Sequence, residues 1–282
     1  MPQAKAFQGN LAARILSAVV LVPAVLAAVW FGAGPFLLFL AIAVGLLAIE
    51  WAKMSAPEAP AEVAVTITVA VLAGAFAAYT GWYRSAWLVV IGGAIVAAVA
   101  SRHRTERAAD AGYGVIYIAP AVIMMIWLRD TASEKDFSWT PGPGVSWMLL
   151  LFAVTWAADI GAYATGNLLK GPKLWPRISP NKTWSGFIGG LAISGLAGAG
   201  MATLLPALGM PVGVAFLVGL VGGVATMAGD LWESILKRRF GVKDSGDLIP
   251  GHGGLLDRVD GLMFAAMAVA FCRLAVNRGW IA

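Results

Sequence analysis

The sequence has few charged residues for its length. Only 12% of its 282 residues are Asp, Glu, Lys or Arg, whereas 60% are hydrophobic. Because soluble domains carry about 25% charged residues, a water-soluble fold of this length would lack the polar side chains to cover its surface. The mean hydropathy is +0.80, and the apolar residues form long runs. The composition therefore excludes an ordinary soluble domain and predicts several membrane spans.

Cysteine and histidine are also scarce. The single cysteine, Cys272, lies in an apolar run, and one thiol forms no internal disulfide or cysteine zinc site. We interpret it as a small hydrophobic residue of the core or of the lipid-facing surface. The sequence contains no Walker phosphate-binding motif, no HExxH zinc motif and no serine nucleophile elbow. These absences argue against P-loop, zinc-hydrolase and serine-hydrolase chemistry.

The apolar runs predict about nine transmembrane helices. Each run is close to the ~20 residues that a helix needs to cross a bilayer, and the runs lack the alternation of barrel strands. The predicted spans are 15–31, 35–53, 63–80, 86–101, 112–128, 145–166, 185–205, 212–229 and 260–278. The first run resembles a signal peptide, but it is long and further spans follow, so we expect it to remain as a span.

The predicted fold class is therefore all-α, a polytopic membrane helical bundle in one domain over residues 1–282. Residues 1–144 contain generic membrane helices, which would serve as scaffold or dimer contact, and residues 145–282 contain the polar loops. In the seventh span, small residues recur every fourth position at Gly186, Gly190, Ser194 and Gly198. This spacing predicts a helix face that allows close packing.

The basic residues indicate the orientation of the bundle. With nine spans, fifteen of the twenty Lys and Arg residues lie on the side of the N-terminus. Cytoplasmic loops carry such an excess, so this side is predicted to face the cytoplasm. We attribute the net charge of +5 to this asymmetry and expect no nucleic-acid partner.

Polar residues of the second half concentrate in two loops on that side, 159–186 and 229–261. Asp159 and Asp230 each follow an apolar run, where a carboxylate is costly unless it is paired or binds a cation. A simple interfacial helix cap is the alternative interpretation. Two such acids beside basic loops favour a functional site.

The second loop is predicted to begin as a helical extension of the eighth span. Asp230, Glu233 and Lys237 share a face of this helix, which Gly241 would end. Asp257 and Asp260 lie at the start of the ninth span, where acids also suit a helix N-terminus. Because Mg²⁺ typically takes one or two carboxylates plus phosphate oxygens, these acids and bases indicate a magnesium–triphosphate site.

At these loops the sequence resembles the phosphatidate cytidylyltransferase family, the CDP-diacylglycerol synthases. In the second loop the resemblance is carried by Ser234, Lys237, Arg238, Lys243, Asp244, Pro250, His252, Gly253, Gly254, Asp257, Arg258 and Asp260. In the first loop it is carried by the Ser-Pro-x-Lys-Thr element at Ser179, Pro180, Lys182 and Thr183. Family members often have an acid shortly afterwards, where this chain has Ser185. The specific resemblance covers roughly residues 155–262.

The resemblance implies CTP and phosphatidate as substrates, and CDP-diacylglycerol and pyrophosphate as products. It also implies Mg²⁺, with K⁺ as a second cation that shares the site, a homodimer, and a multi-pass protein of the bacterial inner membrane. The family places metal on acids that match Asp230 and Asp257. Because the second pKa of a phosphate monoester is about 6, phosphatidate is largely ionised at neutral pH and needs no strong base. A site poor in histidine is compatible with this.

Each candidate residue receives a predicted role. Asp230 and Asp257 are predicted metal ligands, and Asp159, Glu233 and Asp260 are further candidates. The predicted phosphate-binding residues are Lys182, Lys237, Arg238, Lys243, Arg258, Ser179, Thr183 and His252. For the basic residues the alternative is a topology charge or a contact with anionic lipid. Ser179 and Thr183 would otherwise cap the seventh span, and His252 would stabilise a turn.

Two other functions share some of these features. A CTP-dependent kinase of polyprenol or another lipid would need the same metal and nucleotide, and it would release CDP rather than pyrophosphate. An ion-coupled transporter would also have membrane-edge acids and packing glycines. Transporters usually place polar sites near the midplane on broken helices, whereas these acids gather at one face.

Overall fold

The computed structural model describes residues 2–103, 105, 108–129, 138–249 and 253–281. Within these ranges the chain forms nine α-helices, one short 3-10 helix (Pro206–Leu208) and a two-stranded antiparallel sheet. The helices are α1 (Pro2–Phe31), α2 (Ala33–Ser55), α3 (Pro60–Tyr79), α4 (Tyr83–Ser101), α5 (Ala108–Arg129), α6 (Pro143–Leu169), α7 (Trp184–Leu204), α8 (Val212–Phe240) and α9 (Leu256–Asn277). The strands are β1 (Lys173–Trp175) and β2 (Ser179–Thr183). The predicted all-α class is confirmed.

Most of these helices are long and apolar enough to cross a membrane. In the described part of the chain, eight helices, α2 to α9, meet this criterion, and α1 contributes a shorter apolar segment, Leu16–Phe31. Because these helices also bury part of their length against one another, they form one polytopic bundle. The chain is therefore a multi-pass membrane protein, as the sequence predicted.

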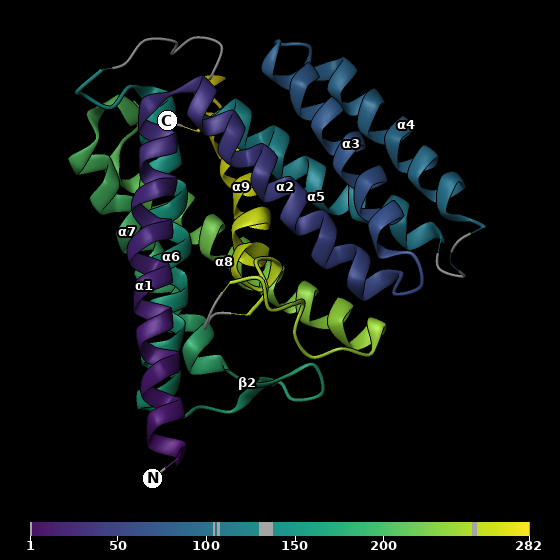
Figure 1. Ribbon diagram of the computed structural model, residues 1–282. Helices are drawn as coiled ribbons and strands as arrows, with labels where there is room; N and C mark the ends of the chain where they lie inside the picture. The colour runs from purple at the N-terminus through teal and green to yellow at the C-terminus, as the bar shows by residue number, and fades with distance from the viewer. Residues whose placement is uncertain (1, 104, 106–107, 130–137, 250–252, 282) are drawn as a thin grey trace.

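The helices alternate in direction, so that the two motif loops lie at one end of the bundle. In Figure 1 the N-terminus lies at the bottom and the C-terminus near the top. The hairpin of β1 and β2 and the connection that follows α8 both lie toward the N-terminal end. This arrangement brings the two polar loops together at one end of the bundle.

The structure corrects the predicted limits of the first loop. Helix α6 continues to Leu169, so Asp159 lies within a helix rather than at the start of a loop. The remaining connection contains the β1–β2 hairpin, in which Lys173 pairs with Thr183 and Trp175 with Ser179. These strands were not predicted from the sequence, because they are too short to show an alternating pattern.

The predicted extension of the eighth span is confirmed. Helix α8 continues past Asp230 to Phe240 and ends at Gly241, whose φ of 76° is left-handed. Glycine adopts this conformation without the strain that a Cβ would cause. The helix therefore carries Asp230 and Lys237 on a continuous scaffold.

Small residues bring α6, α7 and α8 together, as the spacing in the seventh span predicted. A Cβ at Gly190 would lie 2.6 Å from the carbonyl oxygen of Ala158 in α6, and one at Gly198 would lie 3.0 Å from the Cα of Gly219 in α8. Because lipid is as apolar as a leucine side chain, close backbone approach rather than the hydrophobic effect favours such contacts. These glycines therefore fix the positions of the helices that carry the acids.

An aromatic cluster connects the first half of the chain to the end of α8. The indole of Trp51, which is fully buried, lies 5.2 Å from the ring of Tyr117 and 5.7 Å from that of Phe240. Its Nε1–H donates to the carbonyl oxygen of Asp110 over 2.9 Å. The Asp110 carboxylate in turn binds Arg239 over 2.5 Å. Helices α2 and α5 thus hold the polar end of α8 in place.

The packing of α7 on α8 predicts different effects for two glycines of the same helix. A methyl group in Gly198→Ala would fall against the carbonyl oxygen of Ala215, whereas nothing lies within 4 Å of a Cβ at Gly200. We expect G198A to lower the free energy of unfolding by about 1–3 kcal/mol, the usual cost of overpacking. The matched variant G200A should be neutral or slightly stabilising. Thermal unfolding in detergent measures both, and equal stabilities would contradict the packing described.

Candidate active site

A large cavity lies between the helices that carry the predicted acids. Its volume is about 1460 Å³, and its lining comes from α1, α2, α5, α6, α7, α8, α9 and the hairpin. The predicted site residues that line it are Asp159, Lys182, Thr183, Asp230, Glu233, Lys237, Asp257, Arg258 and Asp260. Within the described residues, Ser179, Arg238 and Lys243 lie outside this lining. His252 and Pro250 lie outside the part of the chain that the structure describes.

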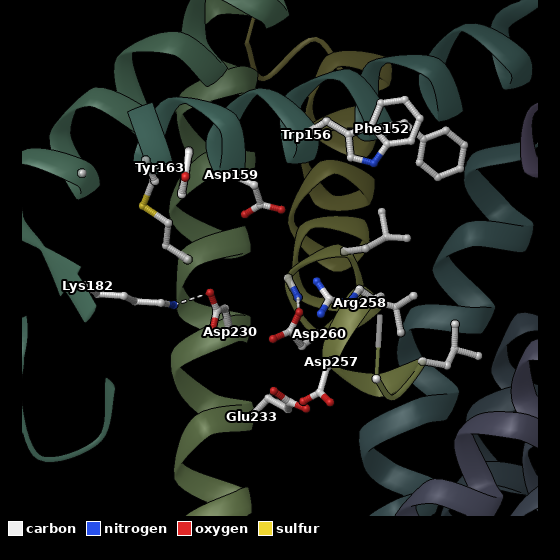
Figure 2. A pocket seen from close by; sticks show the side chains of 18 of the residues that line it. Phe152, Trp156, Asp159, Tyr163, Lys182, Asp230, Glu233, Asp257, Arg258 and Asp260 are labelled. Carbon is white, nitrogen blue, oxygen red and sulfur yellow. Dashed lines mark hydrogen bonds and ion pairs between the residues drawn. The ribbon is translucent and has the colours of Figure 1, made fainter. Parts of the chain in front are cut away.

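The carboxylates of the site come from three helices and face a common space. Asp159 belongs to α6, Asp230 and Glu233 to α8, and Asp257 and Asp260 to α9. Figure 2 shows Asp159, Asp230 and Asp260 around this space, with the carboxylate of Glu233 beside that of Asp257. The two polar loops that the sequence indicated therefore contribute to one site.

Lys182 connects the hairpin to α8. Its ammonium group forms an ion pair with the carboxylate of Asp230 (Figure 2). The two side chains are 24% and 40% exposed, respectively, so both remain accessible from the cavity. The predicted phosphate-binding lysine of the first loop thus meets the predicted metal ligand at the polar part of α8.

Lys237 bridges acids of two helices. Its Nζ lies 2.6 Å from Oε2 of Glu233, one turn earlier in α8, and 2.5 Å from Oδ1 of Asp257 in α9. The Glu233 side chain is only 1% exposed, and its Oε1 has no hydrogen-bond partner within the described residues. A buried carboxylate of this kind depends on the neighbouring cation, because removal of one partner leaves an uncompensated charge.

The first turn of α9 is held closely against α8. Asp257 Oδ2 accepts hydrogen bonds from the backbone N–H of Ser245 (3.0 Å) and from its hydroxyl (2.9 Å). The Gly261 N–H donates to Asp260 Oδ1 over 2.7 Å. A Cβ at Gly229 would lie 3.0 Å from the carbonyl carbon of Asp260. Glycine immediately before Asp230 therefore allows the two acidic segments to approach each other.

Thr183 has the capping role that the sequence analysis gave as one of its two alternatives. Its hydroxyl accepts from the Gly186 N–H over 3.1 Å at the start of α7. Ser185, which stands where the family often has an acid, accepts from the Gly171 N–H over 3.1 Å and lies 3.1 Å from the Thr183 hydroxyl. The two hydroxyls thus fix the hairpin to α7, and Thr183 also lines the cavity.

Several polar residues of the cavity were not predicted from the sequence. Lys170, Lys173 and Asn181 line the cavity with the predicted residues. Glu50 in α2 lies outside this lining and contacts the connection before α9, where the Leu256 N–H donates to its Oε2 over 2.7 Å. Glu50 is an acid inside an apolar run, and this signal, which drew attention to Asp159, could have identified it.

The donor set of the cavity is compatible with a divalent cation that arrives with a nucleotide. The described residues contain no cluster of three or more Asp, Glu, His or Cys side chains arranged to hold a metal. Lysines bind Asp230 and Asp257 instead. Because Mg²⁺ usually keeps several waters and takes one or two carboxylates plus phosphate oxygens, two acids that face one cavity suffice for such a cation.

Comparisons with known proteins agree with the resemblance seen in the motif loops. The sequence profile of the cytidylyltransferase family matches residues 12–275. The chain is 39% identical over 277 residues to a phosphatidate cytidylyltransferase of Brucella suis biovar 1, with 91% of each chain covered. It is equally similar, over the same share of both chains, to one of Brucella abortus biovar 1. A Staphylococcus epidermidis protein of that name is 41% identical over 155 residues, which cover 55% of this chain and 56% of the relative.

The bridge formed by Lys237 predicts a strong effect on stability. In Lys237→Met, Glu233 and Asp257 lose the cation that both contact, and we expect the free energy of unfolding to fall by about 3–5 kcal/mol. Arg238, the next residue, is exposed and donates to the carbonyl of Val242, so R238M should change stability by no more than about 0.5 kcal/mol. Thermal unfolding in detergent compares the two variants. Equal stability of K237M and the unmodified protein would show that the bridge contributes little.

Proposed function

The chain belongs to the cytidylyltransferase family, and we propose that it transfers the cytidylyl group of CTP to phosphatidate. The products are CDP-diacylglycerol and pyrophosphate, an early step of phospholipid biosynthesis. The named relatives, of which two cover 91% of the chain, support this activity. Neither the family match nor these relatives support the lipid-kinase or transporter alternatives.

The structural observation that supports a lipid substrate best is the composition of the cavity lining. One part is formed by acids and bases of α8, α9 and the hairpin, such as Asp230 and Lys182. Another part is apolar and comes from α1, α2, α5 and α6, with Val22, Phe36 and Phe152 among its residues. A single space of this kind suits a molecule with a charged headgroup and acyl chains.

The reaction requires little proton transfer from the protein. An oxygen of the phosphatidate monoester attacks the α-phosphorus of CTP, the bond between this phosphorus and the bridging oxygen to the β-phosphate breaks, and pyrophosphate leaves. The nucleophile is already largely ionised. The main task of the side chains is therefore to hold two anions together and to stabilise the charge on the leaving pyrophosphate.

We assign this task to the basic residues that line the cavity. Lys182, Lys237 and Arg258 reach it from the hairpin, α8 and α9. Ammonium and guanidinium groups form strong, charge-assisted hydrogen bonds with phosphate oxygens. Their positions on three separate elements let them contact the nucleotide and the lipid phosphate together. Arg238 and Lys243, which are exposed and outside the lining, better suit the alternative of a topology charge or a contact with anionic lipid.

We further propose Mg²⁺ as the cofactor, with Asp230 and Asp257 as its protein ligands. Asp159, Glu233 and Asp260 line the same space and are further candidates, including for a second cation such as K⁺. When bound, Mg²⁺ would neutralise triphosphate charge and polarise the phosphoryl oxygens. The protein's own contribution is to bring acids of α8 and α9 close together in the lining of one cavity.

The proposed location is the bacterial inner membrane, with the polar end of the cavity toward the cytoplasm. The named relatives are bacterial, and the chain has several helices that can cross a membrane. The excess of Lys and Arg on the side of the N-terminus supports the cytoplasmic orientation. The homodimer that the family resemblance implies is part of the same proposal.

The activity predicts defined products and a strict requirement for Asp257. Purified protein in mixed micelles with CTP, phosphatidate and Mg²⁺ should form CDP-diacylglycerol and pyrophosphate in equal amounts, and chelation of the metal should stop the reaction. Asp257→Asn should reduce the rate by about a hundredfold or more, because it removes a charge from the reacting centre. Thin-layer chromatography of the lipid and an enzymatic pyrophosphate assay measure the two products.

A matched variant controls for loss of charge alone. Asp247 belongs to the same connection, is exposed and lies outside the cavity lining formed by the described residues, so D247N should retain nearly full activity. Release of CDP instead of pyrophosphate would indicate a lipid kinase. Full activity of D257N would refute the assigned site.

The orientation predicts which exposed positions can be labelled from each side of the membrane. Cys272 is the single cysteine, so a Cys272→Ala background allows new cysteines to be introduced singly. Asp247→Cys in the connection before α9 should react with an impermeant maleimide in inverted vesicles and not in intact spheroplasts. Trp139→Cys, at a position that is 85% exposed before α6, should show the opposite pattern. The reverse result for both positions would place the polar end of the cavity on the periplasmic side and contradict the proposed orientation.

A further inference from the structure

Glu50 is a fully buried carboxylate that connects α2 to the start of α9. Its exposed fraction is 0%. Its Oε1 accepts from the Leu255 N–H over 2.8 Å, and its Oε2 accepts from the Leu256 N–H over 2.7 Å. The hydroxyl of Ser245 lies 3.4 Å from Oε2. A side chain distant in the sequence thus binds the backbone at the point where α9 begins.

These contacts act as a helix cap. The first N–H groups of a helix have no partner within it, and a carboxylate that accepts from them is favoured by hydrogen bonding and by the helix dipole. Helix α9 receives no side-chain cap from its own N-cap residue, Leu255. Within the described residues, Glu50 therefore supplies the cap from a neighbouring helix.

The capped residue Leu256 lies next in sequence to Asp257, the proposed metal ligand. The hydrogen bond to Glu50 therefore fixes the backbone from which the Asp257 side chain extends. Ser245 provides a second connection, because its hydroxyl lies between the two carboxylates and donates to Asp257 over 2.9 Å. A shift of Glu50 would therefore alter the position of Asp257 through two routes.

Two glycines show that the backbone is closely fitted around this carboxylate. A Cβ at Gly246 would lie 2.9 Å from Glu50 Oε1, and a Cβ at Gly254 would lie 3.0 Å from Oε2 and 2.9 Å from the Gly246 nitrogen. Larger residues at either position would displace the carboxylate or the connection before α9. The glycines of this connection thus make room for the buried acid.

We propose that Glu50 is a positioning residue that sets the place of Asp257 for cation binding and catalysis. It lies outside the cavity lining formed by the described residues, and it acts through the first turn of α9 and through Ser245. The inference rests on the proposed function, in which Asp257 is a metal ligand. Through Glu50, the N-terminal half of the chain would thus help to position a side chain of the site.

The experiment compares Glu50→Gln with Glu58→Gln, a matched change at an exposed acid a short distance beyond α2. Mn²⁺ with a non-hydrolysable CTP analogue serves as the probe, and its binding to purified protein is measured by electron paramagnetic resonance without phosphatidate. We expect E50Q to weaken Mn²⁺ binding about tenfold and to lower the turnover number for cytidylyl transfer by a similar factor, because small displacements of reacting groups have large effects. E58Q should match the unmodified protein in both measurements.

The outcomes separate this inference from the proposed function. Unmodified protein that binds Mn²⁺ but forms no CDP-diacylglycerol would refute the function. Active unmodified protein with unchanged Mn²⁺ binding in E50Q would overturn the positioning role, even if activity fell together with the amount of folded protein. If E50Q does not fold, Gly246→Ala provides the test, because its methyl group would lie 2.9 Å from Glu50 Oε1 and displace this carboxylate from the helix cap. Its Mn²⁺ affinity should fall about threefold, and an unchanged affinity would overturn the inference.

Discussion

The acids of α8 and α9 lie close together in a membrane protein, and lysines balance part of their charge. Lys237 contacts both Glu233 and Asp257, and Lys182 contacts Asp230. In a poorly solvated environment an unpaired charge is costly, so these pairs require the hairpin, the end of α8 and the start of α9 to stay together. The glycine contacts of α7 and α8 allow these helices to pack closely, and the aromatic cluster around Trp51 holds the polar end of α8 in place.

The same charge arrangement is suited to the proposed reaction. The substrates bring several negative charges and, with them, a divalent cation, while the protein offers both signs of charge around one cavity. Asp230 remains 40% exposed, so it is accessible to a ligand that enters this space. The apolar lining beside the charged groups suits acyl chains, and the headgroup can therefore meet a soluble nucleotide while the lipid stays in the membrane.

Much of the fold follows from sequence because hydropathy, helix caps and small-residue spacing are local signals. In the part of the chain that the structure describes, the helices, the extension of α8 to its glycine end and the packing face of α7 were predicted in this way. Asp230, Asp257 and Asp260, which line the cavity, were proposed as candidates because they lie at the ends of apolar runs. The hairpin, the ion pair of Lys182 and the cap supplied by Glu50 depend on contacts between distant segments, and a single sequence does not show such pairings. Asp159 was placed in a loop because its helix continues into polar sequence.

The central claim is that one divalent cation binds between Asp230 in the polar part of α8 and Asp257 at the start of α9. It is tested most directly by a crystal structure with Mn²⁺ and a non-hydrolysable CTP analogue, in which anomalous scattering locates the ion. We expect the ion within about 2.0–2.3 Å of carboxylate oxygens of both Asp230 and Asp257, with phosphate oxygens of the analogue completing its coordination. The claim would be contradicted by an ion bound elsewhere and a nucleotide outside the cavity. In that case Lys182 and Lys237 would still form ion pairs with Asp230 and Asp257.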